Sequence, residues 1–175
     1  MRYTPNTLFL DSSVSHIELS VGVFIAYEDV AAGKRAKETC DILGENLGED
    51  WRIRTELANL KSLNIPRLRR IAAVEASKAN IIFISCNDGP LASSVKQWIR
   101  MVVSRGAGPM SLVALFSCPR HEARHAIQAE DYLAAIAKRG RMQFFSCFDS
   151  TPRFQWDWNE RTDPDLGEYG RRICV

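Results

Sequence analysis

The sequence has little excess charge of either sign, no long hydrophobic run and no paired-cysteine motif. Its 23 Lys and Arg residues nearly balance 21 Asp and Glu residues, which gives a formal net charge of +2. A nucleic-acid-binding domain usually carries a strong basic excess, so we expect no nucleic-acid partner. The longest apolar run, residues 21–27, is far shorter than the roughly 18 residues that a membrane-spanning helix needs. We therefore expect no membrane association.

Targeting and redox signals are also missing. Residues 1–13 contain one basic residue and no sustained apolar segment, unlike a secretory signal. None of the five cysteines forms the CxxC pair of a zinc ribbon or a redox motif. Cys174 is next to the last residue, whereas a prenylation box needs its cysteine fourth from the end. These features predict a cytoplasmic location and free thiols.

What is present is an ordinary globular composition, with 46% hydrophobic and 25% charged residues. A chain of 175 residues is long enough to bury a core without disulfides or metals. The length predicts a single domain over residues 1–175, with an N-terminal arm over 1–15 and an irregular C-terminal tail over 148–175.

Short apolar runs alternate with amphipathic helical patterns, as in βα units on a parallel sheet. The run at 51–57 alternates apolar with charged residues, which predicts an edge strand. In the helix that begins at Pro66, the predicted buried stripe consists of Leu68, Ile71, Ala72, Ala76 and Ala79. Strands are predicted at 21–27, 51–57, 80–85, 112–116 and 143–147, and helices at 32–47, 66–79, 90–106 and from after 120 to about 139.

Five strands and four helices in strict alternation, with the exposed strand second, predict a three-layer, flavodoxin-like α/β fold with sheet order 2-1-3-4-5. A fifth helix is replaced by the irregular tail, which contains Phe154, Trp156, Trp158 and Tyr169. Because apolar sheet surface needs a cover, either the tail folds back over its own sheet or the open face becomes a homodimer interface. We expect a homodimer that also uses the tail.

Ligands of such sheets bind outside the carboxyl ends of the strands, next to the point where the strand order reverses. The residues that follow the first, third and fourth strands are therefore the candidate pocket. They are Tyr27, Glu28, Asp29, Cys86, Asn87, Asp88, Gly89, Ser117 and Cys118.

Residues 79–91, followed by Val95, Lys96 and Trp98, resemble the third strand and following helix of NAD(P)H-dependent FMN reductases and flavodoxins. The resemblance implies an FMN cofactor and oxidoreductase or electron-transfer activity. That family's first loop is rich in Ser, Thr and Gly and presents N–H groups to the FMN phosphate. Here the loop opens with Glu28 and Asp29, which would repel a phosphate.

The same acids resemble those of response-regulator receivers, which place Mg²⁺ between an acidic pair and a phosphoacceptor aspartate. Glu28, Asp29, Asp88 and Ser117 fall near the matching strand ends. The lysine that receivers carry after strand five is missing, because residues 145–149 read Phe-Ser-Cys-Phe-Asp. The alternative is that these acids are solvated at a helix start, where Asp29 is favourable.

Two patterns suggest metal ligands. His121, Glu122 and His125 form a literal H-E-x-x-H, but the third zincin ligand is missing, so we expect solvated side chains and no metal. Strands three, four and five each end in Ser-Cys, which leaves two alternatives. The thiols of Cys86, Cys118 and Cys147 form a row suited to zinc, or they pack as small apolar groups in the core.

The chain also resembles a group of small uncharacterised bacterial proteins with this strand–helix order, a resemblance that implies no activity. Every catalytic pattern above lacks one indispensable group. We therefore expect a non-catalytic regulatory or protein-interaction domain without a cofactor. The alternative is an FMN-dependent oxidoreductase or electron-transfer protein. The expected partner is a second copy or another protein.

Overall fold

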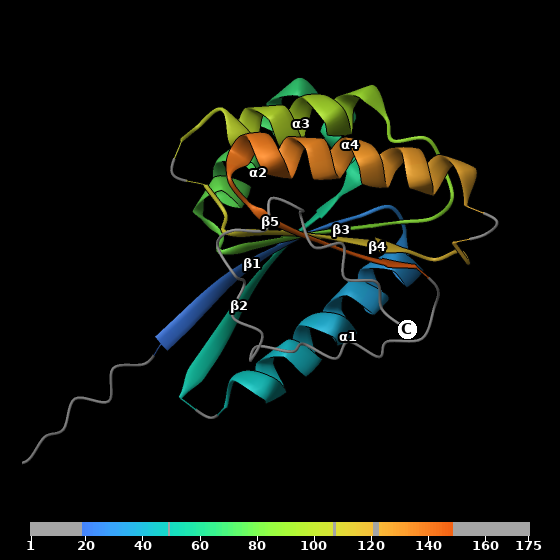
Figure 1. Cartoon of the computed structure of the whole chain (residues 1–175). Coiled ribbons are helices and arrows are strands. Elements are labelled where there is room, and N and C mark those ends of the chain that lie inside the picture. The colour runs from blue at the N-terminus through green and yellow to red at the C-terminus, as the bar shows by residue number, and fades with distance from the viewer. Residues whose placement is uncertain (1–18, 49, 107, 121–122, 149–175) are drawn as a thin grey trace, which may run out of the picture.

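The computed structural model describes residues 19–48, 50–106, 108–120 and 123–148. Strands and helices alternate along these residues (Figure 1). The elements are β1 (Leu19–Tyr27), α1 (Val30–Leu47), β2 (Trp51–Asn59), the short 3-10 helix η1 (Leu60–Asn64), α2 (Pro66–Lys78), β3 (Ile81–Cys86), α3 (Ser93–Val103), β4 (Ser111–Phe116), α4 (Arg124–Gly140) and β5 (Gln143–Phe148).

The five strands form one parallel sheet in the order β2-β1-β3-β4-β5. This order confirms the predicted flavodoxin-like fold, with β2 at the edge. The inner strands are apolar on both faces because both faces are buried, whereas β2 keeps its charged residues in solvent.

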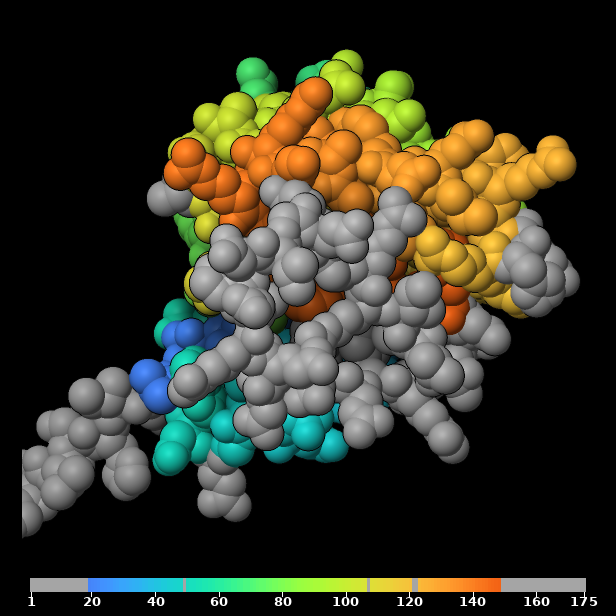
Figure 2. All heavy atoms as spheres, viewed as in Figure 1, coloured from blue at the N-terminus to red at the C-terminus, as the bar shows by residue number. Residues whose placement is uncertain are grey.

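The helices are divided unequally between the two faces. α2, α3 and α4 lie on one face, and α1 is the described helix on the other (Figure 1). Successive residues of a strand point to opposite faces of the sheet, so the strands contribute to two separate hydrophobic cores. Phe24, Ile82 and Leu112 face the three-helix layer, and Val23 and Phe83 face α1. In the space-filling view the atoms of α3 and α4 lie side by side and form one continuous surface (Figure 2).

The predicted buried stripe of α2 is wrong at two positions. Leu68 is 40% exposed and Ile71 is 50% exposed, whereas Ala72, Ala73 and Ala76 are buried. The helix therefore rests on the sheet through its small residues, which allow a close approach. Its larger apolar side chains are left pointing outward.

Several predicted boundaries also shift. α3 begins at Ser93 rather than near Pro90, because Ala92 is still in an extended conformation. β5 continues through Phe148, which the sequence had assigned to the tail. The N-terminal arm and the aromatic residues of the tail lie outside the described residues.

Within the described ranges, none of the helices has both the length and the hydrophobicity to cross a bilayer.

Candidate functional site

The connection between β1 and α1 consists of Glu28 and Asp29. The Asp29 side chain accepts a hydrogen bond from the backbone N–H of Ala32 at 2.8 Å, so it caps the first turn of α1. This bond, followed by one from Asn87, holds the pKa of Asp29 below its ordinary value of 3.8, and the nearby Arg35 guanidinium acts in the same direction. The hydrogen bond that caps α1 therefore favours the ionised form of this carboxylate.

Asn87, directly after β3, connects three loops. Its backbone N–H donates to Glu28 Oε2 at 2.8 Å, and its side-chain amide donates to Asp29 Oδ2 at 2.8 Å. Its amide oxygen accepts a hydrogen bond from the Ser117 hydroxyl at 2.5 Å. Since Ser117 follows β4, one asparagine fixes the ends of β1, β3 and β4 relative to each other.

Asp88 points away from that network and toward α4. Its Oδ1 accepts a hydrogen bond from the backbone N–H of Ala126 at 3.0 Å, in the first turn of the helix. The receiver pattern would place this aspartate with Glu28 and Asp29 around a cation. The geometry instead gives Asp88 a helix-capping bond of its own.

Tyr27 and Gly89 complete the carboxyl edge of β1 and β3. The half-buried Tyr27 ring lies against Gly33 of α1, where a Cβ would come within 3.2 Å of the ring. Gly89 donates its N–H to the carbonyl oxygen of Asn87 at 2.9 Å, which closes a tight turn after β3. Both residues shape the loops at this edge of the sheet.

The three strand-end cysteines do not share one face. Cys86 lies opposite Phe116 in the register and belongs to the core beneath α2, α3 and α4. Cys147 lies opposite Leu115 and belongs to the core beneath α1. Cys118 packs on the same side as Cys86. Burial raises the pKa of the Cys86 thiol to about 12, which suits a packing role.

Of the predicted metal ligands, some lie among the described residues and some lie outside them. No group of three His, Cys, Asp or Glu side chains in these ranges is arranged to hold an ion. His125 is exposed in the first turn of α4. Its predicted partners His121 and Glu122 lie outside the described residues.

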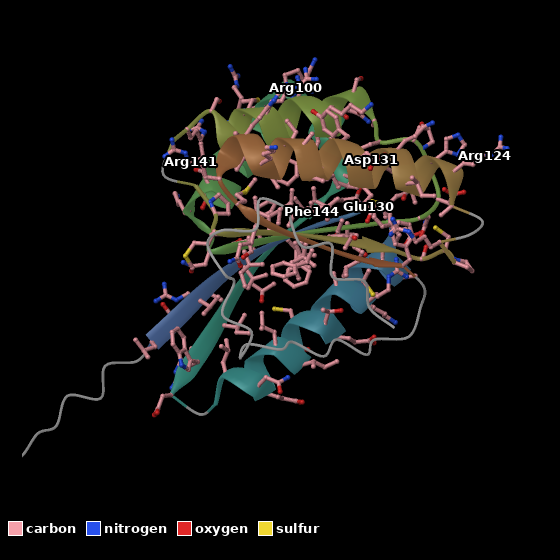
Figure 3. All side chains as sticks on the ribbon, viewed as in Figure 1. Arg100, Arg124, Glu130, Asp131, Arg141 and Phe144 are labelled. Atoms are coloured by element: carbon pink, nitrogen blue, oxygen red, sulfur yellow. The ribbon has the colours of Figure 1, made fainter. Side chains whose placement is uncertain are left out.

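A buried ion pair was missed by the sequence reasoning. Glu130 of α4 is only 1% exposed and faces the sheet (Figure 3). Its oxygens lie 2.9 and 3.1 Å from the Arg120 guanidinium, and the Ser146 hydroxyl of β5 donates to it at 2.6 Å. Arg120 also lies 4.7 Å from the centre of the Phe148 ring. The available signal was Glu130 itself, which interrupts the apolar stripe of Ala126, Ala129 and Leu133.

Within the described residues, the loop between β1 and α1 does not fit the phosphate of an FMN cofactor. In flavodoxin-like proteins that bind a phosphate after β1, free backbone N–H groups of the loop and helix receive it. Here Asp29 already accepts the N–H of Ala32, and Glu28 adds a second carboxylate beside it. A phosphate in this position would meet two negative charges instead of free donors.

No protein-family model and no curated protein matches the chain. Among solved structures, it is similar to a short-chain flavodoxin associated with a PDU bacterial microcompartment, with a TM-score of 0.46 and 12% sequence identity. The alignment covers 72% of this chain and 78% of that one. The fold assignment rests on the strand order. The match to this structure says nothing about the activity of the chain.

Proposed function

We propose that this chain is a non-catalytic flavodoxin-like domain that works by binding another protein. The observation that carries the proposal is the internal pairing at the carboxyl edge of the sheet. Asp29 and Asp88 accept N–H groups from α1 and α4, and Asn87 joins Glu28, Asp29 and Ser117. Ligand sites need a few convergent polar groups that remain available to the ligand. Here these groups hold the loops together.

The surface that best fits a protein partner is the outer side of α2. Ile65, Leu68 and Ile71 recur at intervals of three residues and are between 40% and 53% exposed. The exposed Arg67 and Arg70 lie between them in the sequence. An apolar strip flanked by arginines fits an amphipathic segment that presents apolar side chains together with carboxylates. We propose such an acidic amphipathic segment of another protein as the occupant.

Site-specific photo-crosslinking in cells that naturally make the protein tests this proposal. A photoreactive residue at position 68 should give one discrete protein adduct, and the same residue at position 38, exposed on α1, should not. Introducing Arg67→Glu and Arg70→Glu should abolish the adduct by repelling the partner's carboxylates. An adduct that survives the charge reversals, or equal adducts at both positions, would contradict the proposal.

A flavin titration tests the alternative function. Free FMN loses fluorescence when a protein stacks on its ring, so a binding site produces saturable quenching. We expect no saturation with the purified chain, because Glu28 and Asp29 oppose the phosphate. Binding in the micromolar range or tighter would support the FMN-dependent alternative and count against the proposed function.

A further inference from the structure

β2 is a nine-residue edge strand whose outer side is paired with no strand among the described residues. Its first half lies on a two-stranded extension of the sheet. β1 pairs with β2 from Leu19 onward but with β3 only from Val23 onward, so both strands run past the rest of the sheet (Figure 1). Two strands alone are marginally stable in water, and a long open edge is a template for another strand.

One hydrogen bond shows which residues of β2 direct their backbone N–H and C=O groups toward the open edge. The N–H of Leu19 donates to the carbonyl oxygen of Asp50 at 3.3 Å, while Leu19 lies opposite Trp51. In a parallel ladder the two polar groups of one residue point to the same side, and successive residues alternate. Even-numbered residues of β2 therefore bond to β1. Ile53, Thr55 and Leu57 present their N–H and C=O groups to the open edge.

We propose that a second copy of this chain pairs with that edge, antiparallel, with Thr55 opposite Thr55 of the second copy on a two-fold axis. Outward-facing residues then meet outward-facing residues: Ile53 lies opposite Leu57 of the second copy, and Leu57 opposite Ile53. All backbone groups of this edge find partners. The two sheets join into one of ten strands.

The side chains are self-complementary in this register. Ile53 and Thr55 point toward α1, since they approach Gly44 and Cys40, and Leu57 shares that face. Leu57 is 54% exposed in the single chain and gains an apolar neighbour in the pair. On the opposite face, the exposed Arg54 lies across from Glu56 of the second copy, and the symmetry repeats this contact.

The neighbouring registers are unfavourable. If the two-fold axis moves by one residue toward the start of β2, Arg54 lies opposite Arg54 of the second copy. If it moves by one residue toward the end, Glu56 lies opposite Glu56 of the second copy. Like charges directly opposite each other destabilise a sheet. Registers with an axis between two residues place outward-facing groups against inward-facing ones, which breaks the ladder. Charge complementarity therefore selects Thr55 as the centre.

This dimer does not rest on the proposed function, because it uses β2 and leaves the α2 strip free for another protein. A failed test of the dimer therefore leaves the proposed function standing, and a failed test of the proposed function leaves the dimer standing. Loss of the photo-adduct at position 68 says nothing about pairing at β2, and a monomeric chain says nothing about the α2 strip.

Oxidative cross-linking tests the register in the full chain. The background variant is Cys40→Ala, because Cys40 Sγ lies 3.9 Å from Thr55 Oγ1 and would compete for a cysteine placed there. Thr55→Cys should form a chain-to-chain disulfide. Leu57→Cys alone should not, because its two copies lie about 14 Å apart, but a mixture of Ile53→Cys and Leu57→Cys chains should. No cross-link at Thr55→Cys, or a self-cross-link at Arg54→Cys, would overturn the proposal.

Charge reversal provides a second, independent test by sedimentation velocity. Arg54→Glu and Glu56→Lys should each weaken the dimer by about tenfold or more, and the swapped double variant Arg54→Glu/Glu56→Arg should restore it. Glu38→Lys, on the outer side of α1, makes the same change in charge as Glu56→Lys and should have no effect. A wild-type chain that stays monomeric, or a dimer indifferent to both reversals, contradicts the pairing. Far-ultraviolet circular dichroism of each variant separates lost pairing from lost folding.

Discussion

At the scale of single residues, the carboxyl edge of the sheet is organised by Asn87. It bonds to the loops after β1 and β4 through its backbone and its side chain. Asn87→Ala leaves Asp29 without its amide donor and the Ser117 hydroxyl without its acceptor. We expect the variant to lose about 1 to 3 kcal/mol of unfolding free energy, measured by urea denaturation.

The matched control is Asn46→Ala. The amide of Asn46 bonds to the carbonyl oxygen of Ile42 within one exposed helix turn. Its removal should change the unfolding free energy by less than about 0.5 kcal/mol. Equal effects of the two variants would show that the Asn87 network contributes nothing specific.

Asp29 makes the stability of the fold depend on acid pH. Hydrogen bonds from Ala32 and Asn87 lower the pKa of Asp29 in the folded chain below 3.8. Its contribution is therefore fully present above that value and is lost as the pH falls through the lower folded pKa. Asp29→Asn keeps a capping oxygen without titrating. We expect the difference in melting temperature between wild type and variant to shrink as the pH is lowered from about 6 to about 3.

Glu38→Gln serves as the control for this pH series, because Glu38 lies exposed on the outer side of α1. The difference between Glu38→Gln and the wild type should stay constant over the same range. A constant difference for Asp29→Asn as well would mean that its ionisation is not coupled to folding.

At the scale of elements, sequence periodicity identified the five strands and four α-helices, but it missed the short 3-10 helix η1 and did not show which apolar residues are buried. The stripe of α2 contains Leu68 and Ile71 at helical spacing, and both are exposed. Periodicity marks a face of a helix without saying whether large or small residues on it touch the sheet. The alanines of α2 allow the helix to approach the sheet closely, and only the packed structure shows that these small residues are the buried ones.

The same contrast gives a paired prediction for α2. Ile71→Glu should change the unfolding free energy by less than about 0.5 kcal/mol, because the side chain is half exposed. Ala73→Leu should cost about 1 to 3 kcal/mol, because Ala73 is fully buried and the added atoms have no space. Thermal or urea unfolding of both variants checks the pair. The opposite order would show that α2 is turned by about half a revolution.

The position of the candidate site was predictable from the sequence, but the contacts that its side chains make were not. The strand order placed Glu28, Asp29, Asn87, Asp88 and Ser117 at one edge, where the structure has them. Whether such polar groups face a ligand or each other depends on rotamers and loop geometry that have no sequence signature. The sequence did not predict the Arg120–Glu130 ion pair for a similar reason. Ten residues separate its partners, and the contact forms only when α4 packs on β5.

That pair links the loop after β4 to α4 and β5. Arg120→Met would leave Glu130 buried without a cation. We expect the unfolding free energy to fall by about 3 kcal/mol. This is at the low end for a broken buried ion pair, because the Arg120 side chain is 33% exposed and water can reach the site. The double variant Arg120→Met/Glu130→Gln keeps the bond to Ser146 and removes the charge, so it should recover most of the loss. A single variant as stable as the double, by urea denaturation, would contradict this account.

At the scale of the whole molecule, the two faces of the sheet are covered differently. Three helices lie on one face, and on the other α1 packs mainly on β1 and β3. Val113, Leu115 and Cys147 of β4 and β5 face the α1 side and are almost completely buried. Leaving these side chains in water would cost about 1.5 to 3 kcal/mol for each large one. The β4–β5 half of this face therefore needs a cover beyond α1.

We predict that residues 151–175 supply this cover, because they follow β5 directly and include Phe154, Trp156 and Trp158. Each such aromatic can bury about 150 to 250 Å². A chain ending at Ser150 should therefore aggregate or lose several kcal/mol of unfolding free energy. The full-length triple variant with serine at these three positions should reproduce the loss, while deletion of residues 1–15 should not. If the shortened chain remains soluble and melts at the wild-type temperature, the α1 face is sealed by α1 and the sheet's own side chains, and the C-terminal residues are free for another role.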